Sequence, residues 1–390
     1  MEYKEYLMEE ALETIIDYRG KTPKKSEIGI PTLSAKSVKN NYINYSECYY
    51  ISEAEYKRFM VRGFPQVGDI LLTTEAPMGM VARLDRDDVA IAQRLLTLRG
   101  KPGILSNDYL LYLLQSPYGQ GLLKSKETGT TVTGIRQAEF RRIIIKLPDI
   151  NIQNKITSIL NSIDRKISCN AKINYNLRQQ VQLLYSQIAA EASNENKIPL
   201  VSDEVCRVLP TKITKYSGEK IYIATADVNE HSITNKATRL EYEDRPSRAN
   251  MQPIPWSLWF AKMKASPKYI FINDQCPELV DDCIFSTGFF GLSANRDVFY
   301  YIWAFISSPE FDKTKDAYCS GTTMQALNND GLEKISVYLP DKDVLDLFTE
   351  TVEPIFNKIH SNIIENECLC ALRDSLLPKL LSGAIDVSNI

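Results

Sequence analysis

The chain has 390 residues, of which 44% are hydrophobic and 24% charged, and its formal net charge is −3. These values exclude a disordered or fibrous chain, and the length favours two or three domains over one. No apolar run approaches the roughly 18–20 residues that cross a bilayer, and the acidic N-terminus lacks the pattern of a signal peptide. We therefore expect a cytoplasmic protein without a membrane segment, whose 8 cysteines are reduced thiols.

A tandem repeat organises the sequence. Gly129-Thr130-Thr131-Val132 recurs as Gly321-Thr322-Thr323-Met324, and Leu147-Pro148-Asp149 recurs as Leu339-Pro340-Asp341, both at an offset of 192 residues. Further upstream the register drifts by about two residues, as expected where loops differ in length. The chain is therefore predicted to be a duplication of one unit.

Each repeat is predicted to begin with a mixed α/β domain, over residues 1–150 and 193–342. Short β-type runs, such as 69–73 and 269–272, alternate with polar or Gly/Pro-rich turns. One apolar helix is expected in each domain, near 107–114 and 297–306. The predicted fold class is α+β, with two tandem mixed α/β domains.

A long amphipathic helix is predicted after each domain, over 151–192 and 343–390, because apolar residues recur there at spacings of three and four. Pro354 and Pro378 should kink or divide the second helix, and Gly383 is its expected C-terminal stop. The residues expected to pair the helices are Ile152, Ile156, Ile159, Ile163, Leu177, Leu184, Ile188, Val344, Phe348, Val352, Ile355, Ile359, Leu369, Leu372, Leu376 and Leu380.

Charge favours pairing of the two helices with each other. Segment 150–192 holds five Lys/Arg and two Asp/Glu, whereas segment 343–390 holds three and eight. Opposite charge favours mixed pairing, and the domain between the helices in the sequence favours an antiparallel coiled coil. The alternative is that each helix packs separately on its own domain, since ordinary helices average about 11–12 residues.

Motifs for catalysis or cofactor binding are missing from the sequence. It has two histidines, His231 and His360, and no Cys-x-x-Cys pair, P-loop or Gly-x-Gly-x-x-Gly pattern. The Asn/Asp-Pro-Pro-aromatic tetrapeptide of amino-group DNA methyltransferases is also absent. Glu55-Tyr56-Lys57 has the form of a nuclease triplet, but such triplets arise easily by chance. We therefore expect no catalytic residue, no metal site and no cofactor in this chain.

The repeated architecture and several short motifs resemble the specificity subunits of type I restriction-modification systems over essentially the whole chain. These motifs are Gly20-Lys21-Thr22-Pro23, residues 68–79, residues 285–292 and residues 372–383. The repeats depart from each other at two places. Residues 262–267 stand where the first repeat has 73–77, and Thr287-Gly288 stands where it has Gln93-Arg94. The long helices also lack the Glu-Gln pair that these subunits often have just after the proline that precedes the helix.

The resemblance implies a non-catalytic subunit that reads a bipartite site in double-stranded DNA, with one target-recognition domain for each half-site. It implies two methyltransferase subunits as partners and motor-nuclease (restriction) subunits as further candidates. S-adenosylmethionine, ATP and magnesium would belong to those partners. Two alternatives stay open: the specificity module of another multisubunit methyltransferase without a motor subunit, and a coiled-coil scaffold that binds only proteins.

Base-reading residues are expected on loops, with forked or amide side chains. The candidates are Lys21, Lys36, Lys39, Thr74, Arg94, Lys126, Thr130, Thr131 and Arg136 in the first repeat, and Lys212, Lys215, Lys262, Lys264, Lys268, Thr322, Thr323 and Gln325 in the second. Any one Lys or Arg among them is otherwise a solvated surface charge. The repeated Gly-Thr-Thr either touches DNA or forms a turn and helix cap. Because both domains are nearly neutral, we expect modest DNA affinity from the isolated chain.

Overall fold

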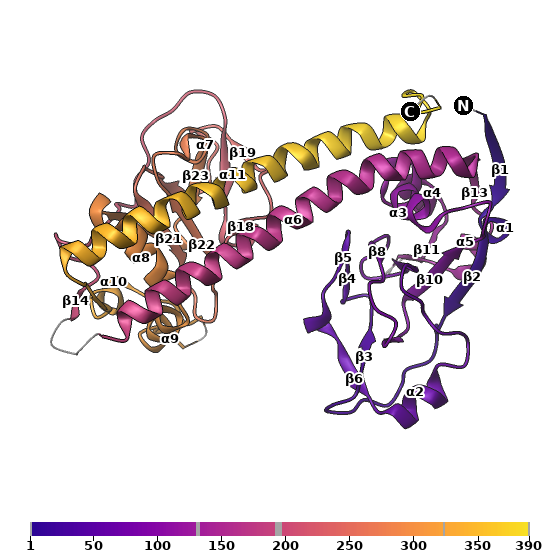
Figure 1. The fold of residues 1–390 in the computed structure, drawn as a ribbon, viewed down its shortest axis with the longest axis horizontal. Helices are drawn as coiled ribbons and strands as arrows, with labels where there is room; N and C mark the ends of the chain where they lie inside the picture. The colour runs from indigo at the N-terminus through magenta and orange to yellow at the C-terminus, as the bar shows by residue number, and fades with distance from the viewer. Residues whose placement is uncertain (1, 130–132, 192–196, 323, 389–390) are drawn as a thin grey trace. The chain divides into compact units, whose positions relative to one another are not determined.

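The computed structural model describes residues 2–129, 133–191, 197–322 and 324–388 (Figure 1). It forms two compact units. Unit 1 consists of Met1–Ser168 and Asn366–Ile390, and unit 2 consists of Cys169–Glu365. In the part of the chain that is described, no helix is long and apolar enough to cross a membrane.

Unit 1 combines short strands with short helices and the first half of a long helix. Its elements are β1 (Tyr3–Leu7), α1 (Met8–Ala11), β2 (Leu12–Asp17), β3 (Ile30–Leu33), β4 (Val38–Lys39), β5 (Tyr42–Ile43), β6 (Tyr49–Ile51), α2 (Glu53–Phe59), β7 (Ile70–Thr73), β8 (Val81–Arg83), β9 (Ala90–Ile91), β10 (Leu95–Gly100), α3 (Asn107–Gln115), α4 (Pro117–Ser125), β11 (Glu127–Thr128), β12 (Gly134–Ile135), α5 (Gln137–Arg141), β13 (Ile144–Pro148) and the start of α6 (Ile150–Ala189).

Unit 2 has the same alternation of strands and helices. Its elements after α6 are β14 (Lys197–Pro199), β15 (Cys206–Val208), β16 (Lys220–Ile223), β17 (Val228–Asn229), β18 (Ser232–Ile233), β19 (Arg239–Leu240), β20 (Ala249–Met251), β21 (Ser257–Ala261), β22 (Tyr269–Ile272), α7 (Pro277–Asp281), β23 (Cys283–Ser286), β24 (Phe289–Ala294), α8 (Phe299–Ile306), α9 (Pro309–Ala317), α10 (Asn329–Leu332), β25 (Ser336–Tyr338) and the first part of α11 (Lys342–Leu381).

The strand order confirms the duplication. One four-stranded sheet runs β2-β10-β7-β8 in unit 1 and β15-β24-β21-β22 in unit 2, so equivalent strands occupy equivalent places. The central pairing is antiparallel in both, with Leu95 opposite Thr73 and Phe289 opposite Ala261. A second sheet in each unit contains one parallel pair, β3 with β9 and β16 with β23. The α+β fold with two mixed α/β domains is therefore confirmed.

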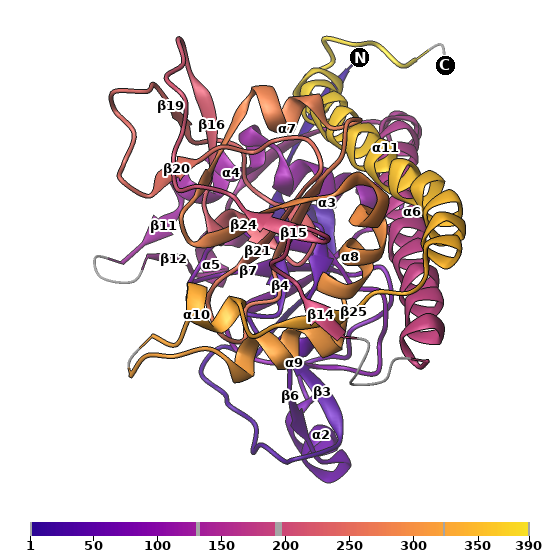
Figure 2. The ribbon, with the colours of Figure 1, turned by 90° about the vertical axis from the view of Figure 1, so that its left-hand side faces the viewer.

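An apolar helix packs on the first sheet of each unit, as expected. In α3 the Ser106 side chain accepts a hydrogen bond from the backbone N–H of Tyr109 (3.1 Å), which caps the helix. All eight residues of α8 are buried, and the helix lies between the sheet and the long helices of unit 2 (Figure 2). Tyr109 and Tyr301, which the repeat offset matches, are both buried there.

Both long helices have 40 residues. Helix α11 continues through Pro354 and Pro378, so these prolines do not divide the helix, and a kink at either of them stays a prediction. Each proline removes one backbone donor, but Phe356 and Leu377 beside the two prolines are buried, and this packing holds the helix together. Gly383 follows the last turn with φ +77°, and its N–H donates to the carbonyl of Leu380 (3.3 Å), which confirms the expected stop.

Helices α6 and α11 pair antiparallel within each unit. In unit 1 the amide of Asn366 donates to the carbonyl oxygen of Ile167 (3.3 Å). In unit 2 the amide of Asn174 donates to the carbonyl oxygen of Ile359 (3.2 Å). The offset of 192 matches Asn174 to Asn366 and Ile167 to Ile359, so the two bonds are equivalent. The donor lies on α11 in unit 1 and on α6 in unit 2. In unit 2 the amide of Asn362 also donates to Asn174 (2.7 Å), so buried asparagines help to fix the register.

The residues expected to pair the helices differ in burial, and their individual roles stay predictions. The buried ones are Ile156, Ile163, Phe348, Val352, Ile359 and Leu380. The partly buried ones are Ile152, Ile159, Leu177, Leu184, Ile188, Ile355, Leu369 and Leu376. Val344 and Leu372 are exposed, on faces of α11 that turn to solvent in this structure. Leu160, Val181 and Leu377 are buried on these helices and were not among the candidates.

Candidate nucleic-acid interface

Three segments of unit 1 that are distant in the sequence meet at the end of strand β7. The backbone N–H of Thr74 donates to the carbonyl of Arg94 (3.0 Å), and the N–H of Ile135 donates to the carbonyl of Thr74 (3.0 Å). Gly134 lies so close that a Cβ there would stand 2.6 Å from the Thr74 carbonyl oxygen, so only glycine fits. We call residues 74–75, 94 and 134–136 junction 1.

Unit 2 builds the same junction with different side chains. The N–H of Lys262 donates to the carbonyl of Gly288 (2.9 Å), and the N–H of Leu327 donates to the carbonyl of Lys262 (2.8 Å). Lys262 therefore stands where Thr74 does, and Gly288 where Arg94 does. We call residues 262–264, 288 and 325–327 junction 2. Both departures between the repeats that the sequence shows involve these junctions.

A carboxylate between two guanidinium groups dominates junction 1. One oxygen of Glu75 lies 3.4 Å from an η nitrogen of Arg19, and the other lies 3.5 Å from Nε of Arg94. Arg19 also donates to the carbonyl of Ile135 (2.9 Å). Arg94 adopts φ +70°, a backbone conformation rare outside glycine, and half of its side chain is exposed. The site thus offers outward N–H donors backed by a fixed negative charge.

Arg19 was missed by the sequence analysis. It directly precedes Gly20-Lys21-Thr22-Pro23, the element that carries part of the family resemblance, and β2 ends at Asp17. Its position beside a motif that opens the domain was the available signal. The contact with Glu75 could not be seen, because 55 residues separate the two in the chain.

Junction 2 presents amines and an amide. Nζ of Lys264 donates to the side-chain oxygen of Gln325 (2.7 Å), and its backbone N–H donates to the Gln325 carbonyl (3.0 Å). Nζ of Lys262 lies 4.5 Å from the centre of the Phe290 ring, and burial lowers the pKa of this amine. Lys268 is less available, since its Nζ donates to the carbonyl of Thr225 (2.6 Å).

Several candidates belong to one or other junction. Arg136 follows Ile135 in junction 1 and is exposed, and Lys126 directly precedes β11, the partner strand of β12. The side chain of Thr74 is buried, so this residue contributes its backbone to junction 1. Thr322 is exposed in the loop that leads to junction 2. Thr130, Thr131 and Thr323 lie outside the described residues, so the role of the repeated Gly-Thr-Thr stays a prediction.

The remaining candidates lie on other loops of their units. Lys21 and Lys36 are exposed, and Lys39 is part of the β4–β5 hairpin. In unit 2, Lys212 is exposed and Lys215 forms an ion pair with Glu243 (2.9 Å). The structure therefore gathers a subset of the candidates at two equivalent places, and the others form no part of either junction.

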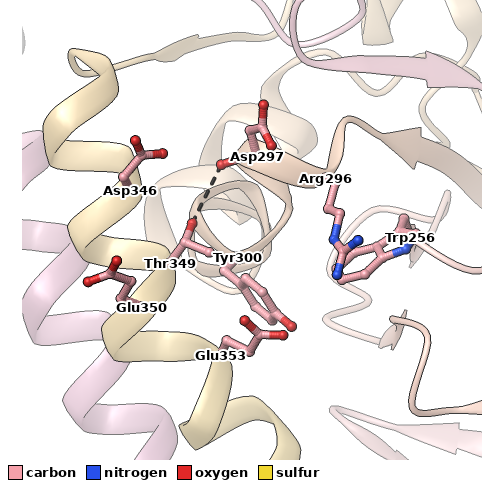
Figure 3. Close-up of a pocket in the computed structure, with 8 residues that line it drawn as sticks. All are labelled: Trp256, Arg296, Asp297, Tyr300, Asp346, Thr349, Glu350 and Glu353. Carbon is pink, nitrogen blue, oxygen red and sulfur yellow. Dashed lines mark hydrogen bonds between the residues drawn. The ribbon is translucent and has the colours of Figure 1, made fainter.

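A separate concave feature of unit 2 is acidic. A cavity of about 240 Å³ lies between α11 and the start of α8, and its lining residues are Trp256, Arg296, Asp297, Tyr300, Asp346, Thr349, Glu350 and Glu353 (Figure 3). The guanidinium of Arg296 stacks on the Trp256 ring at 4.9 Å, and the Thr349 hydroxyl donates to the carbonyl of Asp297 (3.5 Å). Four carboxylates around one cavity repel phosphate groups, so this cavity is unsuited to the DNA backbone.

Side chains that can bind a metal ion lie apart from one another in the described residues. Among them, no three His, Cys, Asp or Glu side chains gather in a way that could hold a metal ion.

Comparison with known proteins points to one family. The family model described as type I restriction modification DNA specificity domain matches residues 12–179. The chain is 24% identical over 388 residues to the type I restriction enzyme MjaIX specificity subunit of Methanocaldococcus jannaschii, covering 93% of this chain and 88% of that one. It is 22% identical over 397 residues to the HindI specificity subunit of Haemophilus influenzae, covering 82% of this chain and 86% of that one.

A solved structure shares the fold. The type I restriction-modification S subunit from M. genitalium matches with a TM-score of 0.53 at 17% sequence identity, over 97% of this chain and 96% of that one. Together with the duplicated α/β fold and the paired 40-residue helices, these comparisons support a type I restriction-modification specificity subunit: residues 12–179 match the family's domain, and the chain is similar over most of its length to two such subunits.

Proposed function

We propose that the chain binds double-stranded DNA at a bipartite site, with unit 1 reading one half-site through junction 1 and unit 2 reading the other through junction 2. The observation that carries this proposal is that the two junctions share the same backbone arrangement but differ in their side chains. Two equivalent hydrogen bonds fix each junction, yet Thr74, Glu75 and Arg94 in one correspond to Lys262, Met263 and Gly288 in the other. A shared frame with different donors and acceptors suits two readers of different sequences.

The same proposal gives each predicted segment a role. Residues 1–150 and 193–342 serve as target-recognition domains, and the helices over 151–192 and 343–390 serve as spacers and docking surfaces. Two methyltransferase subunits bind this chain, and motor-nuclease subunits complete the restriction complex. These partners supply phosphate contacts that a chain of net charge −3 lacks. The chain itself performs no covalent chemistry.

DNA binding measured with and without the partner tests the proposal. The chain co-purified with its methyltransferase should bind a methylation site far more tightly than unrelated DNA, and the affinity should fall steeply with salt. The chain alone should bind weakly and should neither methylate nor cleave DNA. A complex that forms but binds no DNA would favour the protein-only scaffold. Methyl transfer by the chain alone would contradict the non-catalytic role.

A further inference from the structure

Junction 1 holds a charge triplet of Arg19, Glu75 and Arg94 that the described residues of junction 2 do not repeat. At the equivalent positions of junction 2, Met263 replaces Glu75 and Gly288 replaces Arg94. Side chains at these places therefore differ in kind, while the backbone that carries them is the same. A difference of this type, placed on a loop frame, is what distinguishes two base-reading sites.

The geometry leaves the outer part of the Arg94 guanidinium available. Its Nε faces Glu75 at 3.5 Å, and within the described residues its η nitrogens have no hydrogen-bond partner. The Glu75 side chain is largely covered, whereas that of Arg94 is half exposed. A carboxylate behind a guanidinium restrains its rotation, so less freedom is lost when its outer N–H groups bind a ligand.

The chemistry of these groups matches one kind of base pair. In the major groove guanine offers two acceptors, O6 and N7, which a guanidinium binds with two parallel hydrogen bonds. An A·T pair lacks two adjacent acceptors on one base, because adenine offers the N7 acceptor beside the N6 donor and thymine offers the O4 acceptor alone.

We propose that Arg94, held in position by Glu75, reads a G·C base pair in the half-site bound by unit 1. Arg94 contacts the guanine, and Glu75 is the positioning residue. This inference rests on the proposed function, and it names the base that junction 1 selects. Junction 2 has no equivalent of this contact, because Gly288 has no side chain and the amide oxygen of Gln325 is bound by Lys264.

Variants in the assembled methyltransferase complex test the inference. The wild-type motif is first mapped by sequencing methylated DNA, and each base pair of both half-sites is then replaced in binding assays. R94K and E75Q should each reduce the preference for G·C over A·T about 10- to 100-fold at one position of one half-site. The other half-site should be read as before. E9Q is the matched control, because Glu9 pairs with Arg141 at the same 3.5 Å outside junction 1.

The possible failures are distinguishable. If the wild-type complex methylates no bipartite site, the proposed function is wrong. If a bipartite site exists but R94K weakens binding equally for all sequences and lowers the salt dependence, Arg94 contacts phosphate and the inference is overturned. A motif that keeps its full G·C preference in both variants would overturn it too. Co-purification of each variant with the methyltransferase shows that the variant is folded.

Discussion

The two units attach their long helices to α3 and α8 by different chemistry. In unit 1 the hydroxyl of Tyr112 donates to Asp164 on α6 (2.6 Å), and the same carboxylate accepts from Arg373 on α11 (2.9 Å). In unit 2 the residue at the offset of 192 from Asp164 is Phe356, whose ring packs against those of Trp303 (4.9 Å) and Tyr300 (5.6 Å). The same place in the fold therefore holds a carboxylate in one repeat and a phenyl ring in the other.

Equivalent positions of the two repeats therefore keep their place in the fold, whereas the polarity of the side chain there can differ. We call the contact of α6 and α11 with α3 in unit 1, and with α8 in unit 2, the seam of that unit. A hydrogen-bonded carboxylate stabilises the seam only while every partner is present, because a charge that is shielded from water and has no partner is costly. A cluster of rings depends on filled volume and is insensitive to pH. The acidic cavity of unit 2 belongs to the same comparison. Glu353 there corresponds to Asn161 of unit 1, whose amide donates to Asp108 (2.5 Å).

The largest effect is expected from Phe356→Ala in unit 2. The substitution empties the centre of a ring cluster whose members are otherwise buried, and we expect a loss of about 3–5 kcal/mol of unfolding free energy. Urea unfolding followed by tryptophan fluorescence reports on this unit, because Trp256, Trp259 and Trp303 all lie in it. Leu347→Ala, at an exposed side chain of the same unit, should change stability by less than about 0.5 kcal/mol. Equal effects of the two would contradict the assignment of the seam.

A smaller loss is expected from Asp164→Ala in unit 1. The substitution leaves Tyr112 and Arg373 without their shared acceptor, and because both sides of the Asp164–Arg373 pair are partly exposed we expect about 1–3 kcal/mol. Amide hydrogen exchange of α3 and the first half of α6 measures this change locally. Asp374→Ala removes a more exposed partner of the same arginine and should cost less. A greater loss from Asp374→Ala would show that the hydrogen bonds of Asp164 to Tyr112 and Arg373 are not what stabilises this contact.

Acid should destabilise unit 2 before unit 1. Burial first, and the charge of Arg178 second, lower the pKa of His231 to about 3 in the folded chain. The unfolded chain takes up this proton near pH 6.5, so the folded state loses stability as the pH falls below that value, by about 2 kcal/mol at pH 5. Both histidines of the chain lie in unit 2.

Replacement of this side chain isolates its contribution. Unfolding of His231→Phe between pH 7 and pH 5 should be less sensitive to pH than that of the parent chain, since phenylalanine keeps the stacking on Tyr269 and does not titrate. His360→Phe serves as the comparison at the other histidine. If His231→Phe shows the full pH dependence of the parent, the titration of His231 is not its cause.

The elements that depend on local pattern were predictable from the sequence. The Gly-Thr-Thr and Leu-Pro-Asp repeats fixed the duplication, and spacings of three and four fixed both long helices, because each signal lies within one stretch of chain. The division of α11 at its prolines, one of the two outcomes predicted from the sequence, does not occur. The loss of one backbone hydrogen bond at each proline does not end the helix, because Phe356 and Leu377 near them are buried.

The side chains of the junctions were harder to predict. The sequence showed that the repeats depart near residues 73–77 and 93–94, which is where junction 1 lies. It did not show that Arg19 and Arg94 share the carboxylate of Glu75, because the three residues lie on loops that are far apart in the sequence. The sequence did not show burial either, since the side chain of the candidate Thr74 is buried in the structure.

The most direct test of one reader per half-site exchanges one recognition domain. Residues 1–150 are replaced by the corresponding domain of another type I specificity subunit, and the methylated motif is mapped in cells that express the hybrid with its methyltransferase. The account predicts that one half of the motif changes to that of the donor, while the other half stays as before. A motif in which both halves change, or in which neither does, would contradict it.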